Sequence, residues 1–219
     1  MLERIYITRV PSFVSALLTI STATALPILN PFSPHPQVSL PKEVPNLSGV
    51  RADPALAAHG IAQTKQLTKH ILSLPHLPHK IYSSPYYRCI QTILPLAKAL
   101  HLPIYLDEGI AEWYGQLHLQ QSPDHPTPLS VDRWSEFFEG VEFRQGETGI
   151  IPSRRGETME EIHSRTKSAL DRIIDTADRE GVKCLILCTH AATNIALGRA
   201  LTGDPEVQPA PNPSFLILL

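Results

Sequence analysis

Runs of apolar residues recur along the chain at the length of buried strands. The sequence "RIYIT" (4–8) predicts a first strand that ends at Arg9. Two shorter runs predict further strands, "KIYSS" at 80–84 and "LPIYLD" at 102–107. The run "VKCLILCTH" (182–190) is nearly all apolar, which is typical of a central strand that helices cover on both faces.

Helical periodicity fills most of the sequence between these strands. Asp53 and Pro54 predict the N-cap and the first turn of one helix, where the missing N–H of proline costs nothing. A second helix is predicted to open at Pro85, and Pro95 is expected to kink or divide it. Residues 130–144 are expected to be partly helical.

The clearest helix carries its own start and stop signals. Thr158 and Glu161 predict a capping box, and Gly181 predicts the helix end. Another helix, "AATNIALGRALTG" (191–203), follows the central strand. Strands and helices therefore alternate. This order predicts an α/β fold, a single three-layer αβα domain over 1–219 with a mostly parallel central sheet and helices on both faces.

One long region departs from this pattern. Many of the 21 prolines fall between residues 27 and 54, and the run 12–29 is strongly apolar. That run contains six Ser or Thr residues and has no basic segment directly before it, so we interpret it as an anomalous insertion and not as a membrane span. We expect 10–50 to be an atypical Pro-rich insertion, either disordered or an artefact of the gene model.

Composition narrows the class of protein. With 219 residues, 42% hydrophobic residues and a formal net charge of −2, the chain can bury one sizeable core, and its charge does not suggest a basic nucleic-acid-binding surface. The three cysteines are an odd number, and Cys184 and Cys188 lie too far apart along one predicted strand to form a disulfide. We therefore expect a reducing compartment, cytoplasmic or nuclear.

Polar side chains gather where the predicted strands end. Arg9 ends the first strand, Arg88 follows the strand at 80–84, and His190 ends the central strand at the start of a helix. Because the carboxyl ends of parallel strands meet at one sheet edge, we expect two guanidiniums, an imidazole and a helix N-terminus to form a phosphate site. Glu112, in "AEWYG", is a candidate proton donor to a leaving oxygen.

Each of these residues also has a purely structural interpretation. Arg88 can be a surface cation of its helix, His190 a helix cap and Glu112 a solvated carboxylate. Their joint placement after strands favours the functional interpretation. Since the set uses arginine and histidine in place of clustered carboxylates, we expect no metal and no other cofactor.

Four segments together resemble the histidine phosphatase superfamily, also called the phosphoglycerate mutase-like family. They are "IYITR" (5–9), "SSPYYRCIQT" (83–92), "GIAEWYG" (109–115) and "CTHAATNIALGRAL" (188–201). The words "DPALAAHG" and "DREGVKCLILCTHAAT" are further similar to a fungal branch of this superfamily. That branch includes the phosphatase-like subunit of the RNA polymerase III factor TFIIIC.

The resemblance implies a phosphomonoester hydrolase that works through a phosphohistidine. In this family the first strand ends in Arg-His-Gly, and the histidine attacks phosphorus. By matching position, the resemblance implies that Arg9 and Arg88 grip the phosphate. It also implies that His190 stabilises the transferring group and that Glu112 is the acid.

The nucleophile of the family motif is missing. Val10 stands where the histidine belongs, and Pro11 replaces the glycine. Because valine offers no lone pair to phosphorus, we predict that the covalent route is closed. Family-like sequence ends at Arg9 and resumes near Ser48, so we hypothesise that residues 10 to about 40 are a gene-model artefact, such as a retained intron.

Three functions are compatible with these observations. The first is a phosphomonoesterase of the histidine phosphatase type, impaired as the sequence is written. The second is a non-catalytic scaffold subunit of an RNA polymerase III transcription factor complex, and the third is a sensor of small phosphorylated metabolites. Expected partners are a phosphorylated small molecule or phosphopeptide, with transcription complex subunits in the second case. We expect no direct nucleic-acid binding and no membrane association.

Overall fold

The computed structural model describes residues 1–10, 47–50, 52–115, 126–206 and 216–218. Within these residues the chain forms a six-stranded sheet in the order β4-β3-β2-β5-β1-β6. The strands are β1 Arg4–Arg9, β2 Lys80–Ser83, β3 Ile104–Leu106, β4 Phe143–Gln145, β5 Cys184–Thr189 and β6 Leu216–Leu218. All neighbouring strands are parallel except β1 and β6, so the predicted mostly parallel sheet is confirmed.

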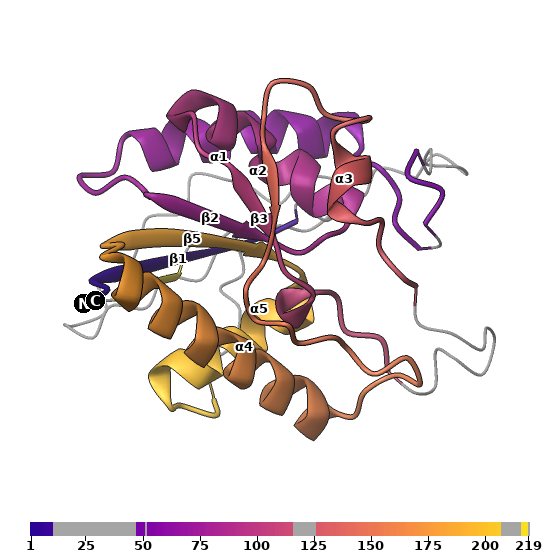
Figure 1. Cartoon of the computed structure of the whole chain (residues 1–219), viewed down its shortest axis with the longest axis vertical. Helices are drawn as coiled ribbons and strands as arrows, with labels where there is room; N and C mark the ends of the chain where they lie inside the picture. The colour runs from indigo at the N-terminus through magenta and orange to yellow at the C-terminus, as the bar shows by residue number, and fades with distance from the viewer. Residues whose placement is uncertain (11–46, 51, 116–125, 207–215, 219) are drawn as a thin grey trace.

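Helices cover both faces of this sheet (Figure 1). One face carries α1 Ala58–Leu72, α2 Tyr87–Leu100 and α3 Val131–Trp134. The other face carries α4 Met159–Glu180 and α5 Ala191–Thr202. A short 3-10 helix, η1 Glu108–Ile110, follows β3. The arrangement is the predicted three-layer αβα sandwich.

The central strand β5 has both faces covered by apolar side chains. Cys184, Ile186 and Cys188 pack into the core beneath α1, α2 and α3. Leu185 and Leu187 pack into the core on the side of α4 and α5. All six residues of the strand are buried. This two-sided burial explains why the sequence there is continuously apolar and not alternating.

The expected start of the first helix is wrong. α1 begins at Ala58 without a side-chain cap, and neither Asp53 nor Pro54 belongs to it. Asp53 instead lies at the start of α2, where its buried carboxylate accepts hydrogen bonds from the backbone N–H groups of Tyr87 (2.6 Å) and Arg88 (3.4 Å). The residue caps a helix, but one that begins 34 positions later in the chain.

Helix α2 differs from expectation, whereas the partly helical character expected for 130–144 is confirmed. Pro95 does not divide α2, which is continuous because its apolar side, including Ile90, Ile93 and Leu96, is fully buried. The region 130–144 is helical only at α3. It also contributes the start of β4, an edge strand too short and too polar for its sequence to predict.

Helix α4 begins and ends as its sequence predicts. The Thr158 hydroxyl accepts from the Glu161 backbone N–H (3.2 Å), and the Glu161 carboxylate accepts from the Thr158 N–H (2.7 Å). The capping box is therefore confirmed. At the other end Gly181 has φ 72°, a left-handed conformation that favours glycine.

Other expectations concern the cysteines and the Pro-rich insertion. All three cysteines are buried free thiols. No helix in the described ranges is long and apolar enough to cross a membrane. Residues 11–46, which include the apolar run 12–29 and most of the expected insertion 10–50, lie outside the described residues. The interpretations of that segment stay predictions.

The buried guanidinium of Arg165 pairs with Glu157 and anchors α4 to η1 and the residue after it. Arg165 and Glu157 are both nearly fully buried, and their charged groups form two hydrogen bonds of 2.6 and 2.8 Å. Arg165 also donates to the carbonyls of Gly109 (3.0 Å) and Ala111 (3.2 Å). One guanidinium thus satisfies two loop carbonyls and one carboxylate in the protein interior.

Glu157→Gln should therefore destabilise the fold strongly. The substitution leaves the buried Arg165 charge without its anion, which costs about 3–5 kcal/mol in the free energy of unfolding. Urea unfolding measures the loss. The matched control is Asp171→Asn, which breaks the exposed Lys167–Asp171 pair and should cost less than about 1 kcal/mol. Equal losses in the two variants would contradict this account.

Candidate functional site

The carboxyl ends of three neighbouring strands meet at one edge of the sheet. In the register of β1 and β5, Arg9 lies opposite Thr189, the residue before His190. At the end of β2, the backbone N–H of Ser84 donates to the carbonyl of Cys188 (2.9 Å). The residues that follow β1, β2 and β5 therefore lie in one region although they are remote in sequence. The sequence predicts this arrangement.

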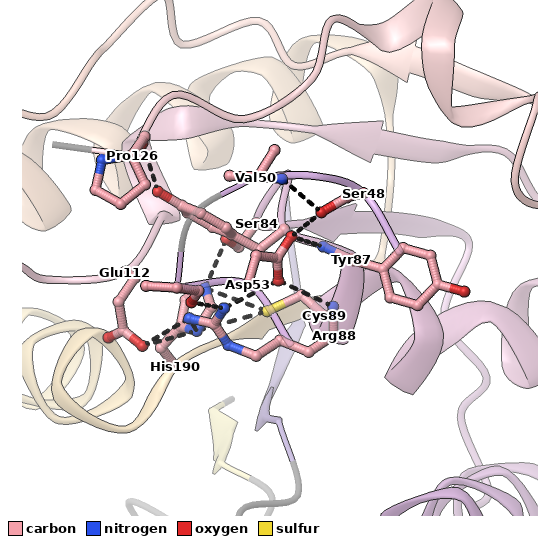
Figure 2. Close-up of polar contacts among 12 residues, drawn as sticks. Ser48, Val50, Asp53, Ser84, Tyr87, Arg88, Cys89, Glu112, Pro126 and His190 are labelled. Atoms are coloured by element: carbon pink, nitrogen blue, oxygen red, sulfur yellow. Dashed lines mark hydrogen bonds and ion pairs between the residues drawn. The ribbon is translucent and has the colours of Figure 1, made fainter. Parts of the chain in front are cut away.

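His190 lies at the centre of the polar contacts in this region (Figure 2). Its Nδ1 is 3.1 Å from Glu112 Oε2 and 3.2 Å from Arg88 Nη2. Its Nε2 is 2.7 Å from Ser84 Oγ and 3.3 Å from Cys89 Sγ. Both ring nitrogens thus have polar neighbours, which fixes the ring at the N-terminus of α5 although the side chain does not cap that helix.

Arg88 is the second residue at the centre of the site. Its Nη1 donates to Asp53 Oδ1 (2.9 Å) and to the carbonyl of Ala52 (3.0 Å), while its Nη2 donates to Glu112 Oε2 (3.0 Å). The guanidinium carbon lies 5.0 Å from the centre of the Tyr86 ring. The side chain is only 12% exposed, so it is not an ordinary surface cation of α2.

The structure thus brings three of the four predicted site residues into direct contact: Arg88, Glu112 and His190. It adds Asp53, whose role at the site sequence reasoning missed. No local pattern distinguishes a carboxylate that caps its own helix from one that caps a remote helix. The sequence motifs also did not predict that Cys89 contacts His190.

Glu112 is held in place by the loop that carries it. The hydroxyl of Thr189 donates to the carbonyl of Ile110 (2.6 Å), and that of Thr193 to the carbonyl of Ala111 (2.8 Å). Together with the Arg165 bonds, these contacts fix the three residues that precede Glu112. A carboxylate on a pinned backbone keeps a defined position, as a site residue requires.

Glu112 and His190 each shift the pKa of the other toward the charged form. Burial would raise the pKa of Glu112, but His190 and then Arg88 lower it to about 2. Burial would lower the pKa of His190, but the adjacent Glu112 carboxylate opposes burial and raises it. At neutral pH the site therefore contains an ionised carboxylate beside an imidazolium, and the proton of this pair resides on His190.

Strand alternation separates Arg9 from Val10. Val10 packs into the same apolar core as Tyr6, the face of the sheet that also holds α2, and its N–H donates to the carbonyl of Thr189 (2.9 Å). Alternation places Arg9 on the opposite face, at the strand end, where it is partly buried and burial lowers its pKa. A common cavity for Arg9, Arg88 and His190 stays a prediction.

Position 10 is nevertheless the position that faces the site. Because Arg9 pairs with Thr189, residue 10 follows in register with His190, and both continue the alternation toward α2. A nucleophile from β1 would therefore lie here. Val10 fills the position with a 9% exposed apolar side chain.

The described residues contain no group of three or more His, Cys, Asp or Glu side chains arranged to hold a metal ion. The chemistry available at the site is that of a guanidinium, an imidazolium and a carboxylate within hydrogen-bond distance of one another. The two cations suit a tetrahedral oxyanion, and the α5 N-terminus adds a favourable dipole.

Comparisons with solved structures agree with this fold. Ecdysone phosphate phosphatase from Bombyx mori superposes with a TM-score of 0.58 at 16% identity, over 94% of this chain and 82% of that one. Phosphoglycerate mutase from Bacillus anthracis superposes with a TM-score of 0.55 at 17% identity, over 97% and 86% of the two chains. At these identities the likeness concerns the fold alone.

Sequence comparisons find closer relatives. Transcription factor tau 55 kDa subunit of Saccharomyces cerevisiae is 39% identical over 159 residues, which are 72% of this chain and 36% of the yeast protein. Phosphoserine phosphatase 1 of Hydrogenobacter thermophilus is 30% identical over 156 residues, 69% of this chain and 66% of the bacterial one. This chain thus spans about a third of the length of the yeast relative.

A family model matches most of the chain. The model of the histidine phosphatase superfamily (branch 1) covers residues 35–212. The match includes Arg88, Glu112 and His190 but begins after Val10. The resemblance predicted from the sequence motifs is confirmed: this chain belongs to the histidine phosphatase superfamily.

Proposed function

We propose that this domain binds phosphorylated ligands through Arg88, His190 and Arg9 but does not turn them over by the covalent route of its family. The observation that carries the proposal is the contrast between two neighbouring positions. His190 keeps its contacts to Arg88 and Glu112, whereas Val10, in register with His190, is apolar and packed into the core. The domain retains oxyanion donors and lacks the atom that would attack phosphorus.

The other nucleophilic atoms near His190 do not replace a histidine. Cys89 is fully buried, and burial raises the pKa of its thiol, so it stays protonated. Ser84 is also fully buried, and its hydroxyl lies against His190 Nε2. Direct attack by water, assisted by the remaining positive charges, can supply only a trace of hydrolysis.

The chain as written should therefore release phenol from phenyl phosphate no faster than its Arg88→Ala variant, between pH 5 and 7. Loss of a nucleophile lowers turnover by several orders of magnitude even where binding groups survive. Continuous assay of phenol release measures this. Turnover clearly above that of Arg88→Ala would overturn the inactive assignment.

Two variants that restore the family motif test whether the missing histidine is the cause of the low turnover. Val10→His is compared alone and together with Pro11→Gly, which rebuilds the family motif after Arg9. A gain of turnover accompanied by acid-labile phosphate on the protein identifies the nucleophile as the missing part. No gain assigns a further defect to the segment after Arg9 or favours a scaffold function.

The second proposed function is that of a non-catalytic subunit of an RNA polymerase III transcription factor. Its support is the 39% identity to Transcription factor tau 55 kDa subunit, which exceeds the 30% identity to the bacterial phosphatase. A scaffold role requires the fold and not the nucleophile, so it is compatible with Val10. This function and phosphate binding do not exclude each other.

If the domain is such a subunit, the tagged chain should co-purify with transcription factor subunits from nuclear extract. Mass spectrometry of the eluate identifies them. Glu157→Gln, which we expect to destabilise the fold, is the control: if binding requires the folded domain, this variant should capture fewer of these subunits. Absence of polymerase III factors from the eluate contradicts the scaffold proposal and leaves ligand binding untouched.

The gene-model hypothesis has its own test. If residues 10 to about 40 are a retained intron, the mature transcript should join the codon of Arg9 to sequence near Ser48 through a different and shorter segment. Sequencing of the transcript across this junction decides the matter. A message that encodes residues 10–50 as written would refute the hypothesis.

A further inference from the structure

The donors that an oxyanion would need already point to one carboxylate oxygen. Arg88 Nη2 donates to Glu112 Oε2 (3.0 Å), and His190 Nδ1 lies 3.1 Å from the same atom. The other oxygen, Oε1, accepts from the backbone N–H of Trp113 (3.1 Å). An oxyanion that reaches Arg88 and His190 therefore arrives within hydrogen-bond distance of an ionised carboxylate (Figure 2).

Two oxyanions can share these donors only if a proton lies between them. A carboxylate oxygen and an unprotonated phosphoryl oxygen are both acceptors, so their contact is repulsive and leaves no hydrogen bond. A phosphoryl O–H changes this, because it donates to the carboxylate. The same geometry that repels a fully ionised group thus binds a protonated one.

We propose that Glu112 makes this site selective for tetrahedral oxyanions that carry a proton, namely phosphomonoesters as monoanions, against sulfate esters of the same shape and charge. The proposal rests on the phosphate-binding function proposed above. A phosphomonoester monoanion offers one P–OH to Glu112 and its ionised oxygens to the guanidinium of Arg88, beside the positive charge of His190. A sulfate monoester has no proton to offer.

Glu112 cannot readily move away from an incoming ligand. Its backbone follows the pinned loop, and the next residue, Trp113, donates its indole N–H to the carbonyl of Glu157 (2.9 Å). Arg88 is equally constrained, since its Nη1 is bound to Asp53 and to the carbonyl of Ala52. A bound ligand must therefore donate a hydrogen bond to the Glu112 carboxylate in its present position.

The charged and titratable groups around the carboxylate keep one state over the relevant pH range. Arg88 faces it from α2, with Asp53 behind, and His190 faces it from the start of α5. His190 and Arg88 hold the pKa of Glu112 well below its usual range, so the carboxylate is ionised between pH 5 and 8, and this carboxylate in turn raises the pKa of His190. The pKa of Tyr114, on the same loop, is raised by burial.

The thiol of Cys89 also stays protonated in this range, because burial raises its pKa. Among the described groups that contact the carboxylate, none then changes charge between pH 5 and 8, whereas the ligand does. A phosphomonoester loses its second proton near pH 6. Its affinity should therefore fall as pH rises through that value, although its negative charge increases. A site governed by cations alone would show the opposite trend.

Phenyl phosphate and phenyl sulfate provide the test on the full chain. At pH 5 both are monoanions, and calorimetric titration should find phenyl phosphate bound at least about tenfold more tightly. Above pH ~6 the affinity for phenyl phosphate should fall by up to about tenfold per pH unit as the monoanion disappears. The affinity for phenyl sulfate should stay low and nearly constant.

Variants assign the preference to the carboxylate. The Glu112→Gln amide can donate to an ionised oxygen, so this variant should bind the two esters within about threefold and lose the pH dependence. The control, Glu136→Gln, makes the same change in an exposed ion pair with Arg133 and should behave as the unmodified chain. A preference that survives in Glu112→Gln would overturn the role of Glu112.

The outcomes separate this inference from the function on which it rests. Equal binding of phenyl phosphate and phenyl sulfate by the unmodified chain at pH 5 would overturn the selectivity and leave the anion site intact. Binding of neither ester would overturn the proposed phosphate-binding function itself. Because the comparison of the two esters uses the unmodified chain, the test does not depend on how any variant folds.

Discussion

The arrangement of the site depends on one buried cation, the guanidinium of Arg88, and on the two carboxylates that flank it. Asp53 binds Nη1 and Glu112 binds Nη2, at 2.9 and 3.0 Å. These two contacts join the segment before α1, the first turn of α2 and the loop after η1. His190 completes the set from the start of α5. Without this charge, two carboxylates would lie close together in a largely dehydrated region, which is strongly unfavourable.

The sequence predicts the parts of the fold that local interactions determine. The capping box of α4 needs only residues three positions apart, and β5 is evident because burial on both faces demands a continuous apolar run. Asp53 shows where such inference stops. Its placement before a proline is equally typical of a local N-cap, and only the tertiary fold brings the first turn of α2 to its carboxylate. β4 was missed for a related reason, since an edge strand of three residues is defined by its partner and not by its composition.

The same limit applies to the site. Arg88, Glu112 and His190 each follow a parallel strand, and they lie together in the structure. This could be predicted because the carboxyl ends of parallel strands lie at one edge of the sheet, independently of the sequence between them. The protonation of the site was not predictable in this way. Glu112 was expected to be an acid, but contact with two cations removes its proton in the unliganded protein. Its proton must come from the ligand or from His190, and this requirement depends on distances that sequence does not encode.

Retention of these residues does not by itself imply turnover. Arg88 satisfies Asp53 and Glu112, and Asp53 caps α2, so loss of any one would leave a buried charge or an uncapped helix. The network therefore has a structural role that does not depend on catalysis. Val10 has the opposite property: a valine at a buried strand end suits the core better than an imidazole would, and nothing in the fold opposes the change. Position 10 can therefore hold an apolar side chain without leaving a buried charge unpaired, unlike Arg88 and Asp53.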